Sequence, residues 1–237
     1  MRDRLESVRE RIEAAARRAG RDPTEIEVVA VTKGFPAAAV VAAVAAGLGA
    51  VGENRVQEAR AKRPATESLL AAEPGLARPL WHLIGHLQRN KVRAALELFE
   101  WVDAVDSLEI AGELSRRLEG SGRRLPVLVE VKTAPEPTKH GLTPEAALDL
   151  APEIGALPGL LVRGLMTMAP WGADPRPAFQ SLRRLRERLA VSWPGPPPHL
   201  PHLSMGMSGD FEIAVEEGGT LLRLGTALFG PRPGDPA

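Results

Sequence analysis

EIEVVAVTKGFP, residues 25–36, is an apolar run that ends in a lysine and a chain-breaking pair. Its small and β-branched residues, Val28 to Val31, are typical of a strand that is buried on both faces. Such strands occur in parallel sheets that helices cover on each side, so this stretch indicates an α/β protein. Lys33 follows the strand directly. Either the strand surfaces there into solvent, or the amine is held at the mouth of a pocket to do chemistry.

Short apolar runs of the same kind alternate with helical patterns along the rest of the chain. Helices are expected at about residues 2–19, at 108–119 and at 178–190 because apolar residues recur there at helical spacing, and a further helix is expected at 210–217. Eight strands that alternate with helices predict a single (β/α)8 TIM barrel. A doubly wound open sheet is the second choice, but no Gly-x-Gly-x-x-Gly turn follows the first strand. The expected strands are 26–33, 49–53, 81–86, 101–106, 126–132, 161–168, 201–206 and 221–228.

Composition narrows the classes of protein that fit. Basic and acidic residues balance at 30 each, so charge favours neither nucleic acid nor an anionic membrane as a partner. The chain has no cysteine, which fits a reducing cytoplasm. Charges interrupt the amphipathic helix at 2–19, which is therefore no signal peptide, and the apolar run 37–52 is too short to span a bilayer. No linker separates two compositions, so residues 1–237 are expected to form one domain.

Polar residues follow nearly every expected strand, which is where TIM barrels place their active sites. Lys33 is one of only five lysines beside 25 arginines. An arginine is a permanent cation, whereas a lysine amine can lose its proton and attack a carbonyl. Lys62, Lys91 and Lys139 lie in polar helix-like or loop-like contexts and are expected to be ordinary solvated residues.

LSMGMSGDFEIAVEEGGTLLRLGTALFG, residues 203–230, contains the last two expected strands. Ser208 and Thr226, with the glycines around them, lie where barrels commonly bind phosphate. Ser208 could equally cap the helix at 210–217. Arg223 and Gly225 are two residues apart on an expected strand, so they share a face. A buried Arg223 needs an acceptor, either from a ligand or from a neighbouring carboxylate.

The histidines and basic residues support weaker interpretations. His82 and His86 share one face of an expected strand, and His199 and His202 follow later. No His-Glu-x-x-His or similar spacing supplies a third metal ligand, so no metal is expected. GHLQRNKVR, residues 85–93, is basic, but the chain has few aromatic residues to stack on bases, so RNA binding is not expected.

Eight ordered motifs resemble the pyridoxal 5′-phosphate homeostasis protein family: AVTKGFP, VGENRVQEA, WHLIGHLQRNKVR, VDAVDSLEIA, TKHGL, VRGLMTMAP, LSMGMSGDFEIAV and LRLGTALFG. The resemblance implies a barrel like the N-terminal domain of alanine racemase and pyridoxal 5′-phosphate (PLP) as cofactor. It implies that Lys33 forms the Schiff base, that Ser208, Gly225 and Thr226 hold the phosphate, that Arg223 faces the pyridine nitrogen, and that Asn54 lines the pocket. The family pattern differs at Gly34–Phe35 and at Gly209, which affects the expected shape of the pocket rim.

A cofactor carrier fits these residues better than an enzyme does. An arginine opposite the ring nitrogen weakens the electron sink that carbanion chemistry needs. A racemase of this fold uses a tyrosine opposite the lysine, and this chain contains none. The resemblance therefore implies a cytoplasmic, monomeric protein without catalysis that holds PLP and passes it to apo-enzymes. Two alternatives remain: a PLP-dependent racemase or lyase, and an aldolase in which Lys33 attacks a phosphorylated sugar.

Overall fold

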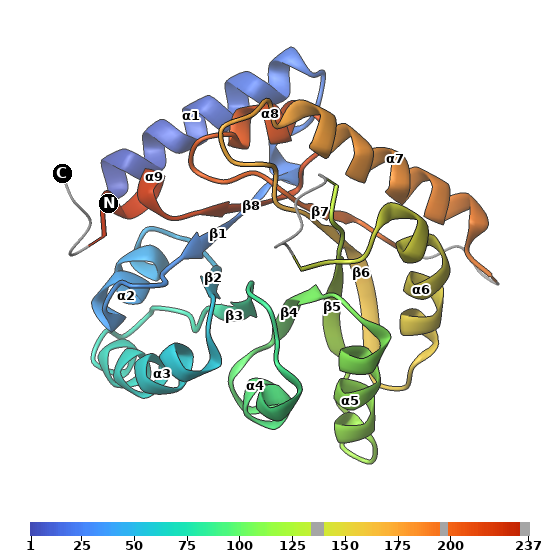
Figure 1. Cartoon of the computed structure of the whole chain (residues 1–237). Coiled ribbons are helices and arrows are strands. Elements are labelled where there is room, and N and C mark those ends of the chain that lie inside the picture. Colours follow the sequence, from blue (N-terminus) through green and yellow to red (C-terminus); the bar gives the residue numbers. More distant parts are fainter. Residues whose placement is uncertain (134–139, 195–198, 233–237) are drawn as a thin grey trace.

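The computed structural model describes residues 1–133, 140–194 and 199–232. Eight parallel strands form a closed barrel in which each strand pairs with its neighbours in sequence, and helices surround it (Figure 1). This confirms the TIM barrel and all eight expected strands. The strands are β1 (Glu27–Val31), β2 (Ala50–Glu53), β3 (Leu80–Leu83), β4 (Trp101–Val105), β5 (Leu125–Glu130), β6 (Leu160–Met166), β7 (His202–Ser204) and β8 (Leu221–Leu224).

The barrel closes between its first and last strands. β1 pairs with β8 from Glu27 opposite Leu221 to Ala30 opposite Leu224. Side chains alternate between the barrel interior and the helices, as the two-residue period of a strand requires. A small apolar cluster on four strands fills part of the interior, and it consists of Ala104, Leu128, Met166 and Leu221.

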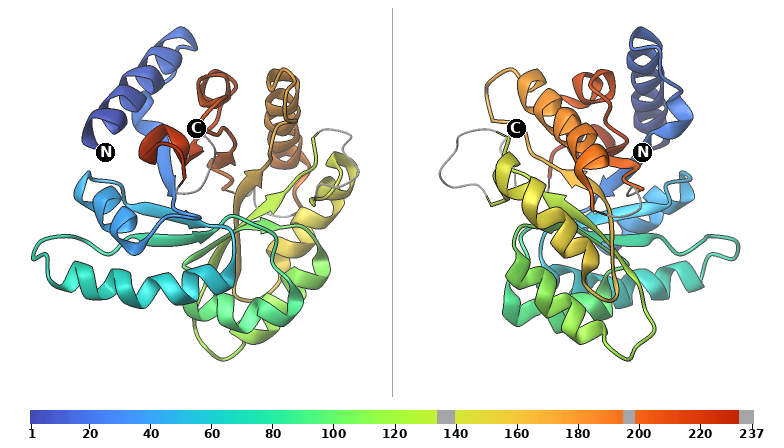
Figure 2. Two further views of the ribbon diagram at one scale, coloured as in Figure 1. Left: turned by 60° about the vertical axis from the view of Figure 1, so that its left-hand side comes forward. Right: turned by 90° about the vertical axis from the view of Figure 1, so that its right-hand side faces the viewer.

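Most helices of the outer ring pack against the next along the chain, and α1 packs against α8 and α9, so the two ends of the chain meet (Figures 1 and 2). α1 buries Leu5, Val8 and Ile12 on one face, which confirms the amphipathic helix expected at 2–19. The helices are α1 (Arg2–Arg18), α2 (Ala37–Ala45), α3 (Val56–Ala71), α4 (Val92–Leu98), α5 (Leu108–Leu118), α6 (Pro144–Ala156), α7 (Arg176–Ser192), α8 (Phe211–Glu216) and α9 (Thr226–Phe229), with short 3-10 turns η1 (Pro23–Glu25) and η2 (Arg89–Lys91).

Two expected strands run past their observed ends by three or more residues. β3 ends at Leu83, so His86 lies in the following loop and does not share a strand face with His82. Gly85 in that loop lies against Asn54: a Cβ on Gly85 would be 2.5 Å from the Asn54 carbonyl oxygen. β8 ends at Leu224 and the chain continues into α9, so the expected strand 221–228 is wrong beyond its fourth residue.

The sequence pattern did not predict the bounds of α3 or of α6. α3 and α6 contain Pro64 and Pro152 inside the helix, where proline is normally unfavourable. α3 also buries the polar side chains of Lys62 and Thr66, which interrupts the apolar periodicity that marks a helix.

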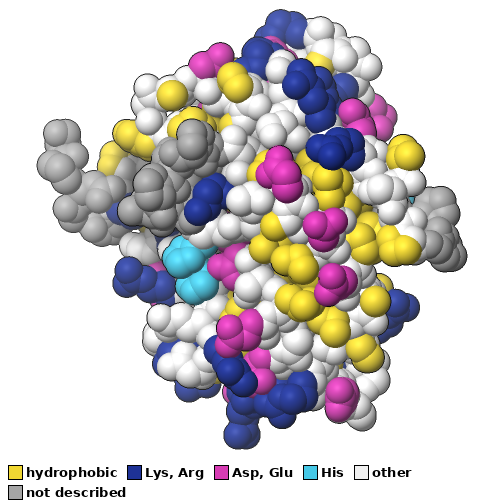
Figure 3. Space-filling model, turned by 45° about the vertical axis from the view of Figure 1, so that its right-hand side comes forward, with side chains coloured by type: hydrophobic (Ala, Val, Ile, Leu, Met, Phe, Trp, Pro, Cys, Tyr) yellow, Lys and Arg dark blue, Asp and Glu magenta, His cyan; other side chains and the backbone are white. Residues whose placement is uncertain are grey.

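Charged side chains of both signs are interspersed on the face of the molecule in Figure 3. Among the described residues, no helix combines the length and the apolar character needed to cross a membrane.

Candidate cofactor-binding site

Lys33 lies two residues beyond β1, at the carboxyl end of the barrel, and its side chain is half-buried. Burial lowers the pKa of the Lys33 amine, and the nearby guanidinium groups of Arg232 and Arg223 lower it further. The carboxylates of Glu58 and Glu53 oppose this shift in part. A larger fraction of the amine is therefore unprotonated, which is the state that attacks a carbonyl carbon.

The backbone on each side of Lys33 is held by side chains of β2 and α3. The Gly34 N–H donates to Glu58 Oε1 at 2.6 Å, and Gly34 has a φ of 76°, which favours glycine. The Thr32 hydroxyl donates to Glu53 Oε1 at 2.5 Å. Burial alone would raise the pKa of Glu58, but the hydrogen bonds from Gly34 and Lys62 lower it. Glu58 therefore stays ionised and holds the turn after Lys33.

Lys62 is not the solvated residue that was expected. It is buried, and its Nζ donates to the Thr32 carbonyl at 2.7 Å, to Glu53 Oε1 at 2.5 Å and to Glu58 Oε1 at 3.0 Å. Glu53 is fully buried, and its Oε2 has no hydrogen-bond partner among the described residues. These contacts join α3 to the segment that carries Lys33. Sequence reasoning missed them because a lysine in a polar helix is usually exposed.

Arg223 lies inside the barrel on β8 and is 4% exposed. Its Nη1 donates to Ser204 Oγ at 2.7 Å and its Nη2 to the Thr167 carbonyl at 2.8 Å. The acceptors are thus a hydroxyl of β7 and a backbone carbonyl of the segment after β6. The sequence did not identify either of them. Burial lowers the pKa of the guanidinium, and the carboxylates of Asp103, Glu130 and Asp210 counteract that effect.

The residues expected at a phosphate come together after β7 and β8. Ser208 Oγ accepts hydrogen bonds from the Gly225 N–H at 3.3 Å and the Ala227 N–H at 3.0 Å. Ser208 therefore does not cap α8. Gly225 precedes α9 and lies outside β8, so the expectation that it shares a strand face with Arg223 is wrong. Thr226 is exposed at the first position of α9.

Asn54 follows β2 directly and is partly buried. Its Oδ1 would be 2.6 Å from a Cβ on Gly85, so this side chain lies against the loop that follows β3. Asn54 is therefore at the carboxyl end of the barrel, as expected, and it occupies the space that the glycine leaves free.

Glu130, the last residue of β5, is a titratable group that sequence reasoning missed. It is 3% exposed, and its Oε2 has no hydrogen-bond partner among the described residues. Burial and the nearby Asp106 carboxylate raise the pKa of Glu130 to about 7, although Arg223 and His86 act in the opposite direction. Glu130 therefore gains or loses its proton near neutral pH.

Glu130→Gln is expected to change how stability depends on pH. The unfolded pKa of a glutamate is about 4.3, so between that value and about 7 the folded protein holds the additional proton. Folding stability therefore falls as pH rises through this window, by up to about 3 kcal/mol. Glutamine cannot ionise. The free energy of unfolding of the variant, relative to that of wild type, should therefore be higher at about pH 8 than at about pH 5.

Denaturant unfolding at the two pH values measures this difference. Glu145→Gln removes an exposed carboxylate from α6 and serves as the control. A Glu130→Gln variant whose stability differs from wild type by the same amount at both pH values would show that Glu130 does not titrate in this range.

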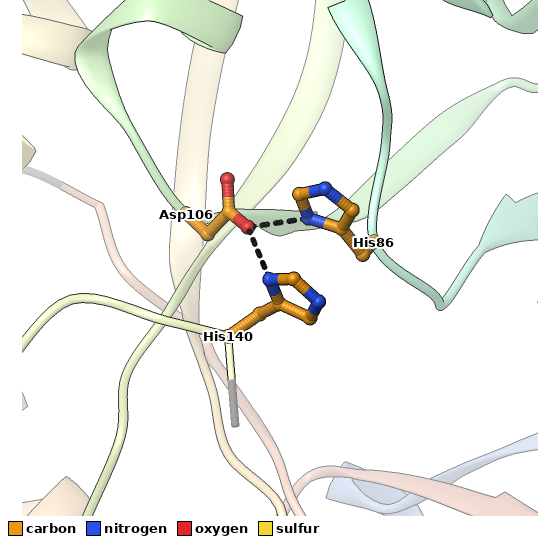
Figure 4. A group of neighbouring side chains, drawn as sticks. All are labelled: His86, Asp106 and His140. Carbon is orange, nitrogen blue, oxygen red and sulfur yellow. Dashed lines mark hydrogen bonds and ion pairs between the residues drawn. The ribbon is translucent and has the colours of Figure 1, made fainter. Parts of the chain in front are cut away.

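His86, Asp106 and His140 form a cluster near the same end of the barrel (Figure 4). His86 Nδ1 lies 2.6 Å from Asp106 Oδ2, and His140 Nδ1 lies 3.8 Å from the same oxygen. The two imidazole rings are stacked, with centroids 3.8 Å apart and planes 10° apart. Each of the three residues offers one ligand atom, and these atoms all lie within 4.8 Å of one another. The absence of a resident metal stays a prediction. Lys139 lies outside the described residues.

Comparison with known proteins places this arrangement in context. The alanine racemase N-terminal domain model matches residues 4–233. A pyridoxal phosphate homeostasis protein of Pseudomonas aeruginosa is 42% identical over 231 residues, which cover 97% of this chain and 95% of the relative. The protein of the same name from Escherichia coli is 38% identical, and the match covers 96% of this chain and 95% of that relative.

Solved structures agree. PipY of Synechococcus elongatus, in a structure described as having PLP bound, is 38% identical with a TM-score of 0.81, over 97% of this chain and 99% of PipY. An alanine racemase of Clostridium difficile is 14% identical with a TM-score of 0.73, over 95% of this chain and 56% of the racemase, and it shows the shared fold alone. The chain belongs to the alanine racemase N-terminal domain family and, within that family, to the pyridoxal phosphate homeostasis proteins.

Proposed function

We propose that this protein binds PLP through Lys33 and acts in PLP homeostasis. The observation that carries this proposal is the environment of the Lys33 amine: it is half-buried at the barrel mouth, and its pKa is lowered by burial and by Arg232 and Arg223. PLP supplies an aldehyde that an unprotonated amine attacks and a phosphate that cations and N–H groups hold. The relatives' names and the PLP-bound structure of PipY support the choice of cofactor.

The described residues fit such a ligand. The guanidinium groups that disfavour a charged Lys33 also make this end of the barrel attractive to a phosphate dianion. Ser208, Gly225 and Thr226 lie together after β7 and β8 and are proposed to contact the phosphate. Arg223 is proposed to face the pyridine nitrogen, and Asn54 to line the pocket.

The protein is further proposed to carry the cofactor without appreciable catalysis. Its curated relatives are named for homeostasis and not for a reaction. The chain has no tyrosine to serve as a second base. Two hydrogen bonds fix the permanent cation of Arg223 in place, and a cation at the ring nitrogen disfavours its protonation. The histidine that could replace the tyrosine as a base is His82. Its Nδ1 is hydrogen-bonded to Asp103 at 3.0 Å, and it lies near the amino end of the barrel, away from Lys33.

Incubation of the PLP-loaded protein with L-alanine in D₂O tests the absence of catalysis. We expect no sustained deuterium exchange at Cα and no inversion, because loss of one positioned base removes about 10²–10⁴-fold in rate. Chiral chromatography and mass spectrometry measure both products. Exchange together with inversion, both lost in Lys33→Ala, would establish the racemase interpretation instead.

We also propose that residues 1–237 form one domain, which acts as a monomer in the cytoplasm and delivers PLP to apo-enzymes. The packing of α1 against α8 and α9 supports a single unit, because it joins the two ends of the chain. The absence of cysteine fits a reducing compartment.

A further inference from the structure

A cavity of about 600 Å³ lies at the amino end of the barrel, opposite the end that carries Lys33. Its walls come from α1, from the loop before β2, and from the first residues of six strands. This volume is within the range of small-molecule sites, about 300–1,000 Å³. The residues used in the argument below are Leu48, Leu80, His82, Trp101, His202 and Leu221, all of which line the cavity.

Three aromatic side chains meet at the inner end of the cavity. The Trp101 ring stacks on His82, with centroids 5.1 Å apart and planes 12° apart. His202 meets Trp101 edge-on, with centroids 5.5 Å apart and planes 76° apart. This arrangement suits a further planar ring. Such a ring can stack on the face of one aromatic side chain and meet a second side chain at right angles.

The inner end of the cavity contains a neutral histidine. Burial and the nearby Arg163 lower the pKa of His202 to about 4, so its imidazole is neutral near pH 7. His202 Nδ1 is buried and has no hydrogen-bond partner among the described residues. His82 already bonds Asp103 through its Nδ1. His202 therefore adds no positive charge to this end of the cavity near pH 7.

The outer part of the cavity combines leucine side chains with the charged side chains of Arg9, Glu13 and Glu27. Leu48 and Leu221 are buried in its wall, whereas Leu80 is 46% exposed although it starts a barrel strand. Leu80 therefore offers an apolar contact to a molecule that enters the cavity.

We propose that this cavity is a second ligand-binding site, which takes a small heteroaromatic molecule. The ligand's ring packs against Trp101 and His202, and its remaining apolar surface covers Leu80. The site shares no residue with the Lys33 end, so occupancy does not require bound PLP.

Binding of 5-fluoroindole to the full-length protein, followed by fluorine NMR with and without PLP, tests this proposal. We expect saturable binding in both states, with a dissociation constant below about 1 mM. Leu80→Arg should weaken binding roughly tenfold or more, because it replaces the exposed apolar side chain that the ligand covers with a charged one. Val191→Arg changes an equally apolar, 90% exposed residue of α7 outside the cavity and should bind like wild type.

Three outcomes overturn the proposed site. The wild-type protein shows no saturable binding, or Leu80→Arg binds with the wild-type affinity, or Val191→Arg weakens binding as much as Leu80→Arg does. Because the assay is also run without PLP, its failure is independent of whether Lys33 binds the cofactor.

Discussion

Lys33→Ala is expected to abolish covalent attachment of PLP and to leave the barrel folded. The nearby Lys62 cannot replace it, because its amine already donates to three oxygens of Thr32, Glu53 and Glu58. Removal of the Lys33 cation also relieves its repulsion by Arg223 and Arg232. Because partial exposure screens that repulsion, the free energy of unfolding should stay unchanged or rise by up to about 1 kcal/mol.

The absorption spectrum of dialysed, PLP-treated protein and its denaturant unfolding curve measure both effects. Lys91→Ala, a change at a lysine of η2 in the connection between β3 and α4, is the matched control and should keep the wild-type spectrum. Retention of the covalent cofactor by Lys33→Ala would remove Lys33 from the site.

Lys62→Met is expected to destabilise the protein strongly. The change removes the cation beside Glu53, whose carboxylate is fully buried, and leaves the Thr32 carbonyl without its lysine donor. Loss of one partner from a buried ion pair costs about 3–5 kcal/mol. The free energy of unfolding at neutral pH measures the loss. The segment that carries Lys33 should also loosen, so PLP affinity should fall at temperatures where the variant remains folded.

The double variant Glu53→Gln with Lys62→Met separates the charge effect from lost packing. It removes both charges, so it should recover a substantial part of the stability that Lys62→Met alone loses. If Lys62→Met unfolds with wild-type free energy, or if the second change recovers nothing, the buried pair does not contribute as described.

The barrel could be predicted from the sequence because its signals are local. Runs such as Val28 to Val31 are typical of strands that are buried on both faces. When eight such strands alternate with helices along the chain, few topologies are compatible with that order. The order of residues also placed Lys33 and Ser208 at the carboxyl end of the barrel, since parallel strands all end on one side.

The interactions around Lys33 could not be predicted in the same way. Lys62 is 29 positions from Lys33, and only the packing of α3 on the barrel buries it beside Glu53. Glu130 looks like any strand-end carboxylate, and its unusual pKa depends on burial beside Asp106, which follows the neighbouring strand β4. Ser208 had two possible roles, and contacts across the barrel rim decided against the cap of α8.

Peptide mapping after borohydride reduction tests the central claim most directly. The protein is incubated with PLP, reduced, digested and analysed by mass spectrometry, with the Lys33→Ala variant treated in parallel. We expect the reduced phosphopyridoxyl group on Lys33 in the wild-type protein and on no lysine in the variant. A label on another lysine, no label at all, or trapping of a sugar phosphate on Lys33 in place of PLP would contradict the account.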